Sequence, residues 1–203
     1  DEEGSTVYSD IWQGNTLLRA KLATIGNIEL PLNSVKKASK YTLTVSIKDT
    51  EFKNQWNFWI FPKETENTLG NVVLAKEINE AVLEQLHAGK KVLLNANNLG
   101  TKKNSVDYNF YPLYWSYTYF PGQGKTSLGM LIQDKHKALE AFPTDYHSDW
   151  QWETFDKKAK AFLLNEAPKD YKPIIQLVDD FHRNNKEGLL FEFKVGKGKL
   201  LVS

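Results

Sequence analysis

The spacing of apolar residues changes near residue 70, and this change constrains the fold more than any other feature of the chain. Before it, apolar and polar residues alternate, most regularly over residues 41–47 and 54–61. A period of two is typical of a β-strand that buries one face. After it, apolar residues recur at helical spacing, at Val73, Leu74, Ile78, Val82, Leu83 and Leu86. The sequence therefore predicts a β domain followed by a domain of another kind.

The first 66 residues carry the alternating pattern. We expect strands at residues 16–25, 27–32, 41–47 and 54–61, with a turn at 48–50. Gly26, Pro31 and Asp49 separate these strands, and Pro62 ends the last one because proline cannot donate to a strand ladder. Short strands divided by turn residues predict an immunoglobulin-like β-sandwich portion over residues 1–66.

Residues 67–203 mix helical and strand patterns. A helix is expected over 72–88, ended by Gly89, and a short buried strand follows at 91–95. A helix followed at once by an apolar strand is typical of an α/β unit. The other expected elements are strands at 128–132 and 161–164, a helix at 147–160 capped by Ser148, a strand or short helix at 173–178, and a hairpin of 189–195 with 200–202. The predicted fold class is mixed α/β: a β-sandwich portion followed by an open α/β module.

The composition excludes several classes of protein. The 203 residues include no cysteine, so disulfides, thiolate metal sites and cysteine nucleophiles are excluded. Lys plus Arg numbers 26 against 25 for Asp plus Glu, and only Arg19 and Arg183 are arginine, which argues against a nucleic-acid-binding face. No apolar run approaches the roughly 20 residues that span a bilayer, so no membrane insertion is expected. The chain starts without methionine or signal peptide and ends in a strand-like segment, and we expect it to be part of a longer protein.

A dense aromatic segment over residues 108–152 is the main candidate for a binding surface. Eight aromatic residues lie between 108 and 120, and His147, Asp149, Trp150 and Trp152 follow within six residues. Aromatic faces beside hydrogen-bonding groups suit a sugar, which has an apolar C–H face and an edge of hydroxyls. The same rings are equally suited to a buried core, and the sequence leaves both interpretations open.

Motifs for catalysis, metals and cofactors are incomplete. The glycines of residues 122–126 lack the spacing of a phosphate loop, since Tyr119 occupies the position of its first glycine. The histidines and aspartates show no metal-ligand spacing. Carboxylates near residues 134–153 form no recognisable acid–base pair. The sequence therefore predicts no catalytic residue, no metal and no cofactor.

Three segments together resemble the C-terminal accessory region of bacterial glycoside hydrolase family 2 proteins, the β-galactosidase-like group. These are residues 54–62 (NQWNFWIFP), Phe142-Pro-Thr with residues 147–152 (HSDWQW), and residues 181–184 (FHRN) with 188–192 and 195–202. The resemblance implies that the catalytic barrel and its two glutamates lie elsewhere in the parent protein. It also implies that residues 67–203 are similar to the class I glutamine-amidotransferase-like fold, without that activity because cysteine is absent.

The function implied is a non-catalytic region that binds carbohydrate or shapes the substrate cleft of the parent enzyme. The alternatives are a purely structural packing or oligomerisation module, including a homo-oligomer, and a glycoside hydrolase in its own right. The expected partners are an oligosaccharide and the catalytic domain of the parent chain, in the periplasm or outside the cell. The predicted carbohydrate-binding residues are Trp115, His147, Asp149, Trp150, Trp152, His182 and Arg183.

Overall fold

The computed structural model describes residues 1–13, 19–33, 35–63, 70–110, 119, 127–155, 159–180 and 183–203. The chain divides into two compact units, Asp1–Thr65 and Glu66–Ser203. Strands dominate the regular structure. Among the described residues the one α-helix, α1 (Glu80–His87), has only eight residues.

The first unit contains an antiparallel hairpin of β1 (Ser39–Ser46) and β2 (Lys53–Ile60). Its register places Tyr41 opposite Phe58, with ring centroids 5.9 Å apart, and Leu43 opposite Trp56. The alternation in the sequence dictates this arrangement, because side chains two residues apart share a face. The strands expected at 41–47 and 54–61 are confirmed.

Two other strands expected in this unit are wrong. Residues 19–33 contain no strand, which removes the strand at 27–32 and the described part of 16–25. Leu22, Ile25 and Ile28 are exposed in this segment. An alternating pattern forms a strand only where a neighbour satisfies its N–H and C=O groups. Within the described part of Asp1–Thr65, β1 and β2 pair only with each other, so this part is a hairpin and not a sandwich.

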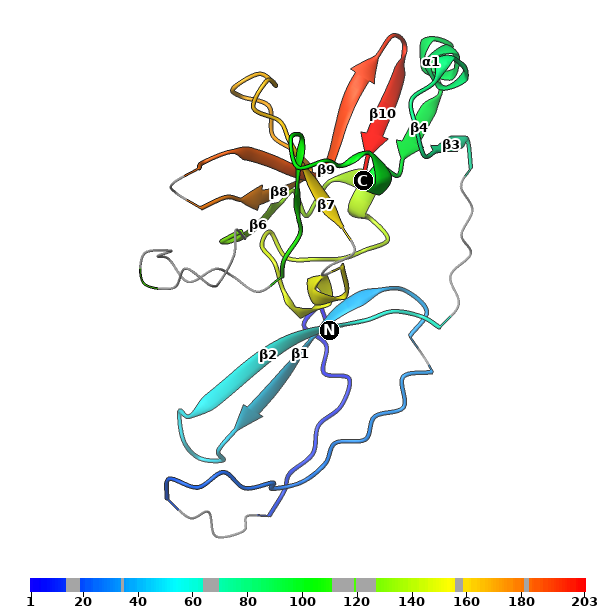
Figure 1. Cartoon of the computed structure of the whole chain (residues 1–203). Helices are drawn as coiled ribbons and strands as arrows, with labels where there is room; N and C mark the ends of the chain where they lie inside the picture. The colour runs from blue at the N-terminus through cyan, green and yellow to red at the C-terminus, as the bar shows by residue number, and fades with distance from the viewer. Residues whose placement is uncertain are drawn as a thin grey trace. The chain divides into compact units, whose positions relative to one another are not determined.

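The second unit is built on an eight-stranded sheet. Its main path runs in the order β3 (Val72–Ala75), β4 (Lys91–Leu94), β10 (Gly198–Val202), β9 (Lys186–Val195), β7 (Lys160–Leu163) and β5 (Ser105–Asp107). Off this path, β8 (Ile175–Val178) pairs with β9 and with β6 (Gly129–Ile132). Figure 1 shows β10, in red, beside β4, in green, although more than 100 residues separate them.

Helix α1 connects the parallel strands β3 and β4. Its N-terminus is capped by the Asn79 side chain, which accepts a hydrogen bond of 3.1 Å from the Val82 N–H. Leu86 is fully buried where the helix packs on β4 and β10. A Cβ atom on Gly198 would lie 2.5 Å from the Leu86 carbonyl oxygen, so this close approach requires glycine.

The α/β fold class predicted for residues 67–203 is wrong, and the unit is sheet-rich. Residues 72–75 form β3 instead of the first turn of a helix, because the apolar run beginning at Val72 pairs in register with β4. The helix expected at 147–160 is a six-residue 3₁₀ helix, η4 (Trp150–Phe155), within the described part of that range. β4 pairs parallel with β3 and with β10, and the other strand pairs described in this unit are antiparallel. A glutamine-amidotransferase-like module would instead need a largely parallel sheet covered by helices.

The remaining strand predictions for this unit are confirmed. They correspond to β4, β6 and β7, and the hairpin expected near the C-terminus is formed by β9 and β10. The segment 173–178, for which the sequence left a strand or a short helix open, contains the strand β8. The strands bury two apolar clusters. One includes Met130, Ile132, Trp152, Ile175, Leu177 and Leu189, and the other includes Leu86, Val92, Leu94, Phe191 and Val202.

Candidate functional site

A pocket of about 310 Å³ lies in the second unit where η4 meets the sheet. Its apolar lining comes from Leu139, Phe142, Trp152, Phe155, Ala159, Ile175, Leu189 and Leu190. Its polar lining comes from Asn95, Asn97, Lys160 and Ser203. A mostly apolar pocket with a few polar groups is the usual form of a small-ligand site.

Three aromatic rings form one part of the pocket lining. Phe142 contacts Trp152 edge-on at a centroid distance of 5.1 Å, and Phe155 lies 5.5 Å from Trp152 and 6.2 Å from Phe142. Trp152 is only 3% exposed, whereas Phe155 is 40% exposed. The cluster therefore extends from the core to the surface, and its outer ring is open to solvent.

Hydrogen bonds with Thr144 and Tyr108 hold Trp152 in place. The Trp152 Nε1–H donates to the Thr144 hydroxyl at 2.9 Å, and the Tyr108 hydroxyl donates to the Trp152 carbonyl at 3.1 Å. A buried indole N–H needs an acceptor, and Thr144 supplies it. These bonds hold the ring against the core while part of it lines the pocket.

Asp149 begins η4. Its Oδ1 accepts a hydrogen bond of 3.0 Å from the Gln151 N–H, which is the role of a helix N-cap. Its Oδ2 lies 3.3 Å from Gln151 Nε2 and 3.4 Å from the Thr144 hydroxyl. Burial raises the pKa of Asp149, against the opposing effect of the hydrogen bonds from Gln151. The carboxylate thus shapes the helix that carries Trp152 and Phe155, and it does not line the pocket.

The polar edge of the pocket is assembled from three separate segments. Asn97 Oδ1 accepts a hydrogen bond of 3.2 Å from the Lys160 N–H, which ties the segment after β4 to β7. The Lys160 ammonium lies 2.5 Å from Asp107 Oδ1 on β5. The Ser203 carbonyl accepts from the Ala96 N–H at 2.7 Å. Asparagine, lysine and serine residues therefore line the pocket beside the aromatic rings.

Of the predicted site residues that the structure describes, only Trp152 lines this pocket. Trp150 is 71% exposed, and its ring lies 5.5 Å from that of Phe110. His147 is exposed, with its ring 4.7 Å from Tyr146 and its Nδ1 3.0 Å from the Ser148 carbonyl. Trp115 and His182 lie outside the described residues.

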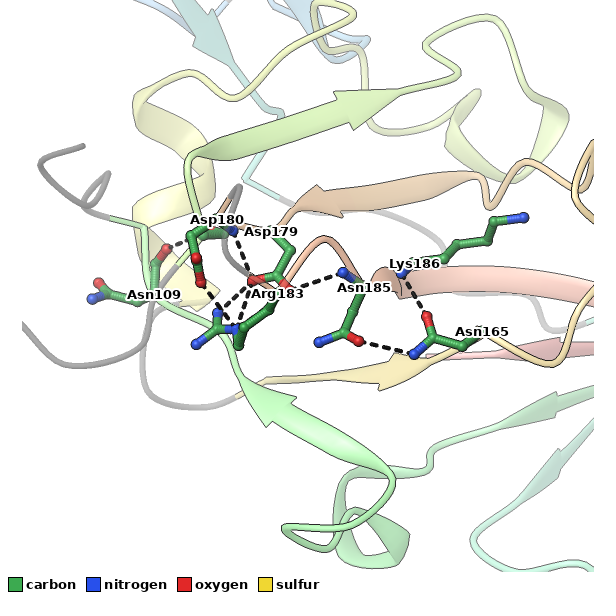
Figure 2. Close-up of polar contacts among 8 residues, drawn as sticks. Asn109, Asn165, Asp179, Asp180, Arg183, Asn185 and Lys186 are labelled. Atoms are coloured by element: carbon green, nitrogen blue, oxygen red, sulfur yellow. Dashed lines mark hydrogen bonds and ion pairs between the residues drawn. The ribbon is translucent and has the colours of Figure 1, made fainter. Parts of the chain in front are cut away.

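Arg183 belongs to a buried ionic cluster at the connection between β8 and β9. Figure 2 shows its guanidinium facing Asp179 and Asp180. The Arg183 Nε lies 3.0 Å from Asp180 Oδ2, and the guanidinium also forms a short ion pair with Asp179. Burial alone would raise the pKa of Asp179, but the Arg183 guanidinium together with the Asn185 and Asp180 N–H groups lowers it below its usual value. Arg183 lines neither of the two pockets described.

Glu187 completes this cluster from β9. It is 1% exposed, and its Oε1 has no hydrogen-bond partner among the described residues. Burial, followed by the charge of Asp179, raises its pKa to about 7. A desolvated group of carboxyls can indicate an acid–base pair, but these side chains line neither described pocket.

The sequence did not indicate Phe142, Phe155, Asn95, Asn97 or Lys160 as site residues. Phe142 lies in one of the three segments that carry the family resemblance, and Asn95 directly follows a predicted buried strand. The sequence held these two signals for Phe142 and Asn95. The spacing of residues along the chain could not show that β4, β7 and η4 bring the five residues together.

Other kinds of site find no support in the described part of the chain. A second depression, of about 460 Å³, is lined by Asn71, Val72, Gly89, Lys90 and Lys91 and carries no aromatic ring. Within the residues described, no group of three or more His, Asp or Glu side chains is arranged so that it could hold a metal ion. No described helix has the length and apolar character needed to cross a membrane.

Comparison with known proteins gives two family matches. Residues 1–62 match the family described as Domain of unknown function (DUF8488), and residues 72–203 match the family described as Domain of unknown function (DUF8487). No curated protein matches the chain. The second match covers well over half of the 203 residues and spans the pocket and the ionic cluster. The chain therefore belongs to the DUF8487 family.

Proposed function

We propose that the unit Glu66–Ser203 binds a short, neutral carbohydrate in the pocket lined by Phe142, Trp152 and Phe155. The observation that carries this proposal is the combination of three mutually contacting rings with the polar lining residues Asn95, Asn97, Lys160 and Ser203. Aromatic rings pack on the C–H face of a sugar, and amides exchange hydrogen bonds with its hydroxyls.

The size and charge of the pocket support this choice of ligand. Its volume of about 310 Å³ is at the lower end of the roughly 300–1,000 Å³ range of small-ligand pockets, which suits a mono- or disaccharide. Lys160 is the one charged residue in the described lining, and its ammonium is paired with Asp107. A neutral ligand leaves that pair intact.

The proposed role is binding without catalysis. Glycoside hydrolysis generally requires two carboxyl groups at the scissile bond. The described lining of the pocket contains neither Asp nor Glu. We propose further that the unit acts beside the catalytic domain of a family 2 glycoside hydrolase, because Phe142 and Trp152 come from a segment that resembles that family.

The test is isothermal titration of a panel of mono- and disaccharides against wild-type protein and two variants. Phe155→Ala removes the exposed ring of the pocket and should weaken binding about tenfold, the order expected when an aromatic contact is lost. Trp150→Ala is the matched control, because it removes a more exposed ring that does not line the pocket, and binding should be unchanged.

Two results would overturn the proposal. One is the absence of binding heat with every sugar for the wild-type protein. The other is a Phe155→Ala variant with wild-type affinity. In either case the purely structural role becomes the better account of the aromatic segment.

A further inference from the structure

Three lysines lie side by side across the sheet of the second unit. The registers of β4, β10 and β9 place Lys91 opposite Lys199 and Lys199 opposite Lys194, so the three residues form one row on one face of the sheet. All three are exposed. Lys199 pairs with Glu192 at 2.7 Å, whereas Lys91 and Lys194 form no ion pair within the described part of the chain. Like charges directly opposite one another destabilise a sheet, so this row is unfavourable unless a partner of opposite charge covers it.

A row of leucines lies beside the lysines on the same face of the sheet. The strand registers place Leu74 of β3, Leu93 of β4 and Leu201 of β10 opposite one another. Leu74 is 56% exposed, and Leu93 and Leu201 are half-buried. This face of the sheet therefore presents apolar side chains bordered by a row of ammonium groups. We call the two rows together the lysine face.

Helix α1 lies on the opposite side of the same strands. It packs on β4 and β10, and its Leu86 is buried in one apolar cluster with Val92 and Leu94 of β4. Successive side chains of a strand point to opposite faces of the sheet, so Lys91 and Leu93 point away from this cluster. The helix and the lysine face are therefore separated by the sheet itself.

The outer side of α1 is acidic. Glu80 and Glu84 lie one helical turn apart, on the side of the helix that faces away from the buried Leu86. Both are exposed, and neither forms an ion pair among the residues that the structure describes. Leu83 of the helix is 37% exposed, and Ile78, just before it, is 43% exposed. We call Ile78, Glu80, Leu83 and Glu84 the acidic face.

We propose that the lysine face binds the acidic face of a second copy of this chain, so that copies associate head to tail. Each face carries unpaired charges of one sign beside exposed apolar side chains, and the other face supplies the opposite sign. Because the two faces lie on opposite sides of one sheet, a single molecule cannot join its own faces. The contact is therefore heterologous, and it repeats from copy to copy. It does not depend on the carbohydrate pocket, whose described lining includes none of these residues.

The experiment measures the mass of the full chain in solution by analytical ultracentrifugation over a wide range of protein concentration. The mean mass of the wild type should rise with concentration beyond that of a dimer, because a heterologous contact builds chains or rings. Raising the ionic strength from about 0.1 M to about 1 M shortens the screening length from about 10 Å to about 3 Å, and should weaken the association.

Charge reversals identify the two faces. A variant with Glu80→Lys and Glu84→Lys, and another with Lys91→Glu and Lys194→Glu, should each remain monomeric, because both faces then carry the same sign. The variant that combines the four substitutions should regain most of the association. Its net charge equals that of the wild type, so the recovery reflects the two faces and not the total charge. A misfolded protein would not regain it, which separates a lost contact from a lost fold.

The matched control carries Lys102→Glu and Lys103→Glu. It makes the same change of charge as the lysine-face variant, at two exposed lysines just before β5, and it should associate like the wild type. A wild type that is monomeric at every concentration would overturn the proposal and leave the lysine face to a different protein. Association that persists in both single-face variants would also overturn it, since the contact would then lie elsewhere, for example at the exposed rings of Trp56 and Phe58. So would a combined variant that stays monomeric, or a control that loses the association.

Discussion

At the scale of single residues, Arg183 shows how burial changes the role of a side chain. The sequence contains two arginines: Arg19 is exposed, while Arg183 is half-buried beside the buried Asp179 and Asp180. An arginine on an open surface can bind a ligand, whereas one packed against buried carboxylates compensates their charge. The structure places Arg183 in the second situation.

The Arg183→Gln substitution should therefore lower the free energy of unfolding by about 3 kcal/mol or more at pH 7, because it leaves buried carboxylates without their cation. Urea denaturation followed by circular dichroism measures this loss. Arg19→Gln, at an exposed position, should change the stability by less than about 0.5 kcal/mol. Equal effects of the two substitutions would show that the ionic cluster is not a source of stability.

At the scale of secondary-structure elements, the short helix η4 determines the pocket. It carries Trp150 outward and contributes Trp152 and Phe155 to the pocket lining. The sequence indicated a longer helix capped by Ser148, but the hydrogen bond to the Gln151 N–H comes from Asp149.

The two cap assignments predict different mutant stabilities. Asp149→Ala should lower the free energy of unfolding by about 1–2 kcal/mol, because it removes the acceptor for the Gln151 N–H. Ser148→Ala should be close to the wild type, and Asp149→Asn should retain most of the stability because an amide oxygen can still accept. Thermal unfolding of the three variants decides between the residues, and a larger loss for Ser148→Ala would contradict the structure.

At the scale of the whole molecule, the chain combines a small unit with a larger one. Asp1–Thr65 contains, among its described residues, a single two-stranded sheet, whereas Glu66–Ser203 contains an eight-stranded sheet and two apolar clusters. The family matches, 1–62 and 72–203, fall on either side of the division between the units. An isolated hairpin is at best marginally stable, whereas a multi-stranded sheet with a core folds independently.

Expression of the two units as separate proteins tests this difference. Residues 66–203 should unfold cooperatively with urea, because their core and sheet are complete within the unit. Residues 1–65 should show no cooperative transition of their own. Cooperative unfolding of residues 1–65 alone would indicate stabilising structure beyond the hairpin.

The sequence by itself determined the elements whose pattern is local. Alternation over residues 41–47 and 54–61 specified the first hairpin, and short apolar runs specified β4, β6 and β7. Local rules failed where a pattern suited two structures. The segment from Val72 has helical spacing but forms β3, because pairing with β4 satisfies its backbone groups.

The tertiary structure alone decided the fold class, the pocket and the ionic cluster. Parallel pairing of β10 with β4 and antiparallel pairing of β9 with β7 join segments that are far apart in the sequence. The fold places Asn97 and Lys160 in one pocket lining with Trp152. The physical reason is that the burial of a side chain depends on neighbours that long-range strand pairing supplies.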